Sequence, residues 1–226
     1  MSGTGSRFGG SVPKQFHPLP GANLPVFHVT LEKFLSEFSL EKVVLVVNPQ
    51  YLDLPLLHNS LNLLQTKFPE SECSVVSGGN SRHESFVLGA QYAIEKFDQN
   101  IHILVHDANR PYVSPDFLTG IQKSLLQLSP EKPVFLPVIP VNDSICRATE
   151  NRLENYVDRS ELFRIQTPQL LYGPSLATAL RQKSTSKENF VDFTDEGSFM
   201  KAMGYNVFTF TGDSENIKIT YPEDIQ

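Results

Sequence analysis

The feature that most constrains the fold is an alternation of short apolar runs with longer stretches of helical periodicity. Residues 42–47 (Lys-Val-Val-Leu-Val-Val) form a continuous β-branched run that ends at Asn48-Pro49, which is typical of a strand buried on both faces. Similar runs occupy 73–76, 101–105, 133–138 and 207–210. Helices are predicted at 25–38, 56–68, 81–97, from Ser114-Pro115 onward, and at 174–183 and 194–204. Strands that alternate with helices predict an α/β fold, with a largely parallel sheet covered by helices on both faces.

The composition of the chain limits the kinds of protein that it can be. Its 226 residues are 40% hydrophobic, enough for one sizeable core, and we expect a single domain over 1–226. The net charge of −6 argues against a nucleic-acid binder, which is usually basic. Two cysteines suggest neither a disulfide framework nor a zinc site, and they favour the cytoplasm. The sequence shows no apolar run of membrane-spanning length, so we expect no membrane partner.

Residues 140–165 differ in character from the rest of the chain. They are polar and charged, with weak period-two patterning around 153–157 and 162–165. We interpret this segment as an excursion from the main sheet, made of extended strands or an arm.

The N-terminal fifteen residues combine glycines with two cations. Glycine recurs at Gly3, Gly5, Gly9 and Gly10, around Arg7 and before Lys14. Glycine lets backbone N–H groups turn toward an anion, and the cations add fixed charge, so the stretch fits a phosphate loop. A disordered glycine-rich terminus is the alternative that these residues alone leave open.

Two further segments follow predicted strands and carry residues of the types that often bind ligands. Gly78-Gly79 stands before a helix that Ser81 and Glu84 should cap, although an ordinary strand-to-helix turn would look the same. Asp107 follows the strand at 101–105, at the sheet edge where ligands collect, and its carboxylate could bind a divalent cation or merely cap a turn.

In a parallel sheet the loops at 3–14, 78–85, 107–110 and 216–218 would converge on one edge. Together they supply two glycine turns, one carboxylate and the basic residues Arg7, Lys14, Arg110 and Lys218. That set suits a nucleoside triphosphate with a metal. The chain lacks a Walker-type Gly-x-x-x-x-Gly-Lys-Ser/Thr motif, and it offers no plausible Ser/His/Asp set for nucleophilic catalysis.

The sequence resembles the methylerythritol-phosphate cytidylyltransferases, whose relatives include the ribitol-phosphate cytidylyltransferases. The matching pieces occur in family order along almost the whole chain. They are Gly3-Thr4-Gly5-Ser6-Arg7 with Pro13-Lys14-Gln15; Gly78-Gly79-x-x-Arg82-x-x-Ser85; Val105-His106-Asp107-Ala108-x-Arg110-Pro111; Asp143-Ser144; Asp158-Arg159-Ser160 with Gln166-Thr167-Pro168-Gln169; Thr194-Asp195-Glu196; and Asn216-Ile217-Lys218-Ile219-Thr220-x-Pro222-x-Asp224.

This resemblance implies a Rossmann-like nucleotidyltransferase fold with a β-arm at 140–165, which in the family reaches across a homodimer. It also implies an enzyme that uses CTP and magnesium. The phosphate of a polyol acceptor would attack the α-phosphorus of CTP and release pyrophosphate. Positioning and charge neutralisation supply most of the rate in such reactions.

The resemblance also implies roles for individual residues. Gly3, Thr4, Gly5, Arg7 and Lys14 would bind the triphosphate. Gly79, Asn80 and Ser85 would contact cytosine and ribose. Asp107 would meet acceptor hydroxyls or magnesium, while Arg110, Arg159, Thr167 and Lys218 would bind the acceptor. Of these, Arg7, Lys14, Arg159 and Lys218 are the expected catalytic residues.

The leading hypothesis is a cytidylyltransferase acting on 2-C-methyl-D-erythritol 4-phosphate in isoprenoid precursor synthesis, since Asp158-Arg159-Ser160 and Leu162-Phe163 look more like that branch. A ribitol-5-phosphate or other polyol-phosphate cytidylyltransferase is the alternative. A third possibility is a shortened, weakly active nucleotide-binding homologue. In the family a strand precedes the glycine loop and a helix follows residue 226, so we expect the sheet to lack one core strand.

Overall fold

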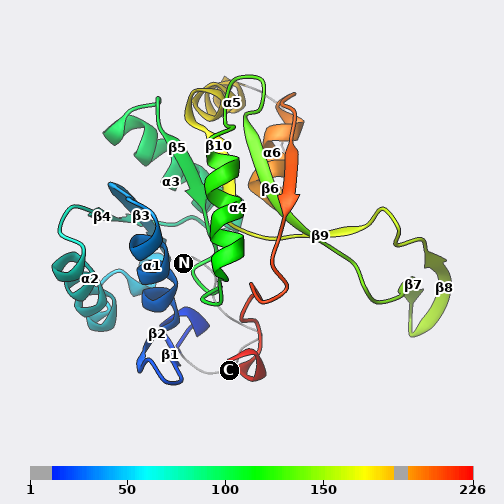
Figure 1. Ribbon diagram of the computed structural model, residues 1–226, viewed down its shortest axis with the longest axis horizontal. Helices are drawn as coiled ribbons and strands as arrows, with labels where there is room; N and C mark the ends of the chain where they lie inside the picture. Colours follow the sequence, from blue (N-terminus) through cyan, green and yellow to red (C-terminus); the bar gives the residue numbers. More distant parts are fainter. Residues whose placement is uncertain (1–11, 186–192, 226) are drawn as a thin grey trace.

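A mixed β-sheet covered by helices on both faces forms the centre of the molecule (Figure 1). The computed structural model describes residues 12–185 and 193–225. The α-helices of this part are α1 (Val26–Glu37), α2 (Pro55–Lys67), α3 (Arg82–Phe97), α4 (Pro115–Leu125), α5 (Gly173–Thr185) and α6 (Glu196–Ala202). Short 3-10 helices are η1 (Lys14–Phe16), η2 (Pro49–Tyr51) and η3 (Pro222–Asp224). None of the helices in these two ranges is long and apolar enough to cross a membrane.

The strands fall into one larger sheet and smaller pairs. They are β1 (Pro18–Leu19), β2 (Leu24–Pro25), β3 (Lys42–Val47), β4 (Glu72–Ser77), β5 (His102–Val105), β6 (Val134–Pro140), β7 (Ile145–Thr149), β8 (Arg152–Val157), β9 (Phe163–Ile165), β10 (Gln169–Tyr172) and β11 (Phe208–Thr211). Among the described residues the larger sheet has the order β11-β6-β10-β5, with β9 also paired to β6. Strands β3 and β4 form a separate parallel pair.

The α/β class predicted from the alternation is confirmed, but the strand directions need a correction at β10. Residues 169–172 were not predicted as a strand, and β10 runs antiparallel to both β5 and β6. The reason is that β9 and β10 pair with successive parts of β6, so the chain leaves β6 and returns along it as in a long hairpin. Parallel pairing is found for β11 with β6 and for β3 with β4.

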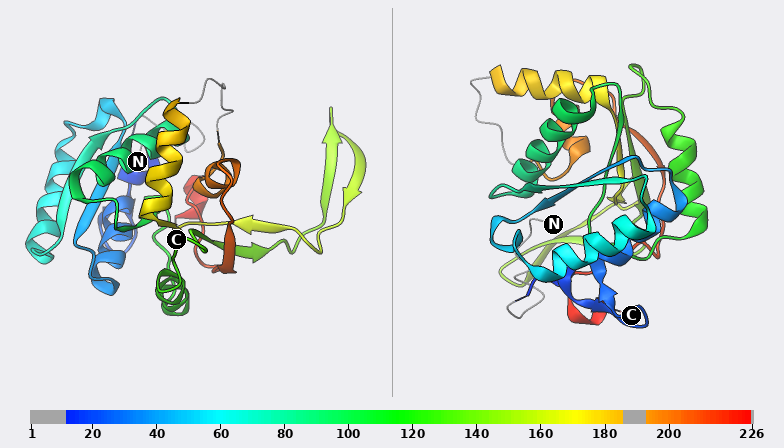
Figure 2. Two further views of the ribbon diagram at one scale, coloured as in Figure 1. Left: turned by 90° about the horizontal axis from the view of Figure 1, so that it is seen from above. Right: turned by 90° about the vertical axis from the view of Figure 1, so that its left-hand side faces the viewer.

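The core is divided by the larger sheet into two layers. On one face, α3, α5 and α6 pack against Val134, Leu136 and Leu171. On the other face, α1 and α4 pack against Phe135 and Leu170, because neighbouring residues of a strand point to opposite faces. Figure 2 shows α4 in green on one side of the sheet and α5 and α6, in gold and orange, on the other. A third cluster joins Phe16 and α1 to β3 and α2.

Residues between 140 and 165 form the extended strands that their patterning predicts. Strands β7 and β8 pair antiparallel as a hairpin, and Figures 1 and 2 show it standing well away from the rest of the molecule. Its side chains are mostly exposed, including Leu153 and Tyr156. The connection through β9 brings the chain back to the sheet.

Helix starts follow the capping signals, with one correction. Ser81 caps α3 and Ser114 caps α4, each accepting a backbone N–H from the first turn. The predicted cap at Thr194 is wrong by one residue, since the Asp195 side chain accepts from the Ser198 N–H. An aspartate binds a helix N-terminus more strongly than a threonine because its charge also faces the helix dipole.

Candidate active site

A single carboxylate surrounded by cations marks the candidate site. Asp107 lies just beyond the end of β5, with 13% of its side chain exposed. Its Oδ2 atom is 2.9 Å from Lys218 Nζ and 3.1 Å from Arg110 Nε. Its Oδ1 atom lies 3.8 Å from Arg82 Nε. Residues far apart in the sequence therefore meet at one edge of the sheet, as the loop arrangement predicts.

These cations keep Asp107 ionised. Burial alone would raise the pKa of this carboxyl group, but Lys218, Arg110 and Arg82 together lower the pKa well below its usual range. A permanently ionised carboxylate accepts hydrogen bonds from hydroxyl groups and cannot act as a general acid at neutral pH. The surplus of positive charge around it favours an anionic ligand.

Buried hydrogen bonds fix the cations in place. Arg110 Nη1 donates to the carbonyl of Asn216 at 2.8 Å, and Asn216 Nδ2 donates to the carbonyl of Thr167 at 2.8 Å. Asn109 Nδ2 donates to the carbonyl of Ile219 at 2.6 Å, and the Ile219 N–H donates back to the Asn109 carbonyl at 2.9 Å. The segment that carries Lys218 is thus held against the loop that carries Asp107.

Thr167 contacts Asp107, and His106 contacts Thr167. The N–H of Asp107 donates to Thr167 Oγ1 at 3.1 Å, and Thr167 Oγ1 lies 3.0 Å from His106 Nδ1. Burial lowers the pKa of His106 to about 4, against smaller opposing effects from Asp107, so the ring is neutral at pH 7. Because His106 Nε2 faces the carbonyl of Arg110 at 3.2 Å, Nε2 carries the proton and the Thr167 hydroxyl donates to Nδ1.

The glycine turn before α3 is closed by the side chains of its own helix. The N–H of Gly79 donates to Ser85 Oγ at 3.0 Å, and the N–H of Asn80 donates to Glu84 Oε2 at 2.7 Å. A Cβ added at Gly79 would come within 2.3 Å of Glu84 Cγ, so this position needs a glycine while Glu84 lies there. The predicted nucleotide contacts Gly79, Asn80 and Ser85 therefore lie together at the N-terminus of α3.

The N-terminal loop is only partly within the described residues. Lys14 begins η1 and is half-buried. Gly3, Thr4, Gly5 and Arg7, predicted to bind the triphosphate, lie outside the described residues.

Arg159 occupies a different place from the other predicted acceptor residues. It follows β8, is exposed, and its guanidinium donates to the carbonyl of Asn142 within the same excursion. In the described part of one chain, Arg110, Thr167 and Lys218 are brought together around Asp107, whereas Arg159 is bound at the base of the hairpin.

Comparison with known proteins shows the family of the chain and agrees with its fold. The sequence model of the family described as 2-C-methyl-D-erythritol 4-phosphate cytidylyltransferase matches residues 1–226. The chain belongs to this family. A protein of that name from Haemophilus ducreyi is 33% identical over 226 residues, covering 99% of this chain and 89% of the relative.

Relatives of different length share the same region. A bifunctional enzyme named IspD/IspF from Desulfotalea psychrophila is 31% identical over 224 residues, and the match covers 99% of this chain but only 53% of that protein. The chain thus spans about half the length of this relative. A crystal structure of a 4-diphosphocytidyl-2C-methyl-D-erythritol synthase superposes with a TM-score of 0.74 at 28% identity, covering 93% of this chain and 90% of the other.

The described residues of this family member do not fit a magnesium ion bound by protein ligands alone. Magnesium prefers several oxygen ligands in octahedral geometry. No group of three or more His, Cys, Asp or Glu side chains suited to a metal occurs in residues 12–185 and 193–225. Asp107, the predicted metal ligand, has both oxygens facing cations, which oppose a further positive charge.

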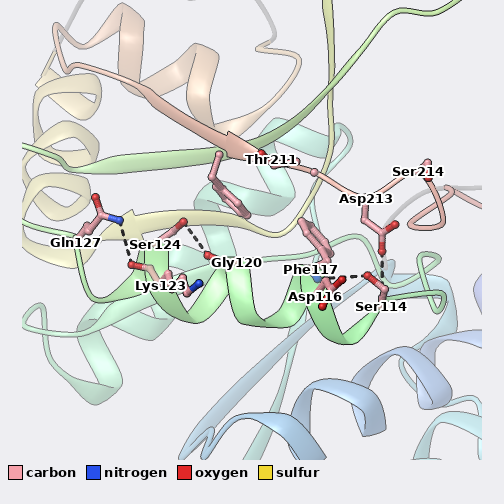
Figure 3. A pocket seen from close by; sticks show the side chains of 12 residues that line it. Ser114, Asp116, Phe117, Gly120, Lys123, Ser124, Gln127, Thr211, Asp213 and Ser214 are labelled. Atoms are coloured by element: carbon pink, nitrogen blue, oxygen red, sulfur yellow. Dashed lines mark hydrogen bonds between the residues drawn. The ribbon is translucent and has the colours of Figure 1, made fainter.

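A separate hollow of about 520 Å³ lies between α4 and β11 (Figure 3). Its lining residues do not include Asp107 or the three cations around it. Phe117 and Phe210 stack at 6.0 Å in its wall. Its charged lining residues are Asp116, Lys123 and Asp213, and Asp213 already accepts the N–H of Ser114 at 3.1 Å. Because acids outnumber the one lysine, this hollow suits a triphosphate poorly.

Two residues of the site were not singled out by the sequence. Arg82 and Glu196 belong to matching family motifs, but no role was predicted for either. In the structure Arg82 contacts both Glu196 and Asp107. An acidic residue in the first turn of a helix resembles an ordinary dipole interaction, so only its burial to 1% exposure reveals that Glu196 needs a partner.

Proposed function

We propose that this chain transfers the cytidylyl group of CTP to 2-C-methyl-D-erythritol 4-phosphate and releases pyrophosphate, a step in isoprenoid precursor synthesis. The family match over residues 1–226 supports this reaction class. The observation that carries the proposal is the cluster in which Lys218, Arg110 and Arg82 surround the ionised Asp107. Such a cluster offers cations to a phosphate and a carboxylate to hydroxyl groups on the same ligand.

The proposed reaction is an in-line displacement. An oxygen of the acceptor phosphate forms a bond to the α-phosphorus of CTP, and the bond from that phosphorus to the bridging oxygen of pyrophosphate breaks. Pyrophosphate leaves with the electron pair of that bond, so no covalent intermediate with the protein is needed. The protein accelerates the step by bringing the phosphates together and neutralising their charge.

Each group of residues has a part in this proposal. Arg7, Lys14 and the loop with Gly3, Thr4 and Gly5 bind the triphosphate, and Gly79, Asn80 and Ser85 bind the base and ribose. Lys218 and Arg110 bind the acceptor phosphate, and Asp107 accepts hydrogen bonds from the acceptor hydroxyls. Thr167 places Asp107 through the N–H contact of 3.1 Å.

Magnesium is proposed to enter with CTP. The phosphates of the nucleotide would then supply most of its oxygen ligands, which agrees with the absence of a carboxylate cluster among the described residues.

We also propose a homodimer in the cytoplasm. The β7–β8 hairpin exposes Leu153 and Tyr156, and a second chain would cover such apolar side chains. In a dimer, Arg159 of one chain would reach the acceptor phosphate of the partner. The free cysteines Cys73 and Cys146 suit a reducing compartment, and the net charge of −6 argues against a nucleic-acid partner.

A substrate panel tests the reaction. Pyrophosphate release is measured with CTP, UTP and ATP against methylerythritol phosphate and ribitol 5-phosphate, with magnesium present. We expect CTP with methylerythritol phosphate to be fastest, because the loops and the family match both favour that pair. Faster release with ribitol phosphate would instead make the chain a polyol-phosphate cytidylyltransferase. Nucleotide binding without release would indicate a weakly active homologue.

Variants of Lys14 locate the triphosphate site. Lys14→Ala should lower kcat by about 100-fold or more, because a cation placed on the developing charge is lost. Lys33→Ala is the matched control, since Lys33 is a partly exposed lysine of α1 that pairs with Glu37 at 3.8 Å. Turnover of Lys14→Ala at the wild-type rate would remove Lys14 from the site.

A further inference from the structure

An ion pair between a partly exposed arginine and a buried glutamate joins the starts of two helices next to the candidate site. Arg82 is the first residue of α3 and Glu196 the first residue of α6. Arg82 Nη1 donates to Glu196 Oε1 at 2.7 Å, and Arg82 Nη2 donates to Glu196 Oε2 at 2.9 Å. Two parallel hydrogen bonds of this kind fix the plane of the guanidinium as well as its position.

The remaining nitrogen of the same guanidinium faces Asp107. Arg82 Nε lies 3.8 Å from Asp107 Oδ1, while Lys218 and Arg110 contact the other oxygen, Oδ2. Cations therefore face both oxygens of Asp107, and Arg82 is the residue that connects this carboxylate to α6. A lysine at position 82 could neutralise Glu196, but its single ammonium could not form the fork and also face Asp107.

The burial of Glu196 favours its ion pair with Arg82. Only 1% of Glu196 is exposed, whereas 36% of the Arg82 side chain is. Burial raises the pKa of Glu196, and the charge of Arg82 opposes that rise. An unpaired carboxylate at this depth is costly, so the buried Glu196 holds the partly exposed guanidinium of Arg82 close to it.

We propose that Arg82 is a positioning residue for the polyol-phosphate acceptor: Glu196 fixes its guanidinium so that Nε orients the Asp107 carboxylate toward the acceptor hydroxyls. The inference rests on the proposed function, in which Asp107 binds those hydroxyls. It adds that α6 influences acceptor binding through Arg82. The effect should appear in KM for the acceptor and not in KM for CTP.

The test compares steady-state kinetics of Arg82→Lys, Glu196→Gln and Asp107→Asn. We expect Arg82→Lys to raise KM for methylerythritol phosphate roughly tenfold with KM for CTP unchanged, because the misplaced carboxylate still leaves the nucleotide site intact. Glu196→Gln should change the same constant in the same direction. Combining the two should add little, since both act on one contact.

Glu72→Gln is the matched control. It removes an exposed carboxylate that pairs with Lys42 and with Lys96 of α3, far along the helix from Arg82. Its KM for the acceptor should equal that of the wild type. Circular dichroism and melting of every variant identify those that fold, and only folded variants are compared.

The outcomes separate this inference from the proposed function. If Asp107→Asn raises KM for the acceptor while folded Arg82→Lys and Glu196→Gln do not, Arg82 is merely structural and the inference is wrong. An equal rise in both KM values for Arg82→Lys would also overturn it. If Asp107→Asn leaves KM for the acceptor unchanged, the proposed role of Asp107 fails and this inference fails with it.

Discussion

At the scale of single residues, burial and neighbouring charges set the protonation states of Asp107 and His106 at pH 7. Asp107 stays ionised because three cations face it. His106 stays neutral because burial removes its charged form from water, and its ring lies 4.6 Å from that of Phe34. A neutral ring lets Thr167 donate to Nδ1 and so accept the N–H of Asp107. The protonation state of one buried histidine therefore helps to place the carboxylate.

This arrangement predicts a loss of stability in mild acid. The pKa of His106 is about 4 in the folded chain and near 6.5 in the unfolded chain. Between these values the unfolded chain binds more protons, so the free energy of unfolding falls as the pH is lowered through this window. The full effect is at most about 3 kcal/mol. Urea titrations at several pH values between 4 and 7.5 measure it.

Two variants check the assignment to His106. His106→Gln should flatten the dependence between pH 4 and 6.5. In this variant a smaller dependence of the free energy of unfolding on pH should remain, because burial also lowers the pKa of His28. His58→Gln, which replaces an exposed histidine of α2, should keep the wild-type slope. An unchanged slope in His106→Gln would mean that other groups cause the acid sensitivity.

At the scale of elements, helix N-termini and strand ends bring the candidate site together. The glycine turn precedes α3, Glu196 begins α6, and Asp107 follows β5. The capping residues Ser81 and Asp195 fix where these two helices begin, and hence where Arg82 and Glu196 lie. The β7–β8 hairpin is the exception, because it lies away from the rest of the molecule (Figure 1). Arg159 follows β8 and binds the carbonyl of Asn142 at the base of this hairpin.

Mixing two inactive variants tests whether the hairpin serves a partner chain. Arg159→Ala and Lys14→Ala should each lose most activity on their own. If Arg159 acts in trans, a heterodimer has one site with both residues intact, and an equal mixture should recover about a quarter of wild-type activity. Pyrophosphate release before and after mixing is the measurement. Activity that stays at the level of the separate variants would place Arg159 in its own chain's site or outside any site.

At the scale of the whole molecule, the packing of α3 joins the β3–β4 pair to the rest of the fold. Phe86 and Ala90 of α3 belong to the core layer of α5 and α6, while Gly89 lies against Val46 of β3. A Cβ at position 89 would be 2.5 Å from Val46 Cγ2, far closer than van der Waals contact. The small residue allows the helix and the strand to approach closely.

Two glycine-to-alanine changes distinguish the effect of this close packing on stability from the effect of helix propensity. Gly89→Ala should destabilise the protein by about 1–3 kcal/mol, because a short, stiff valine cannot move aside easily. Gly120→Ala in α4 should instead stabilise it by about 0.5–1 kcal/mol, since its Cβ would lie 3.7 Å from Phe210 and alanine favours a helix. Urea denaturation measures both. Stabilisation by both changes would show that α3 and β3 are not tightly packed.

The sequence by itself determined the local elements and the residue types of the candidate site. The run at 42–47 was predicted as a strand and is β3, and the caps at Ser81 and Ser114 were predicted correctly. Asp107, Arg110, Thr167 and Lys218 were predicted as neighbours and lie together. Periodicity and capping act within a few residues, so helices and strands can be recognised without a structure. The family can be recognised in the same way, because its motifs follow one another in a fixed order along the sequence.

Only the tertiary structure decided the direction of β10 and the importance of Arg82 and Glu196. The sequence 169–172 is too short to show its partner, and its antiparallel course depends on how the chain returns along β6. Glu196 gains its role from burial and from Arg82, 114 residues away in the chain. Burial and long-range charge pairing arise only when distant segments pack together, so a local pattern cannot predict them.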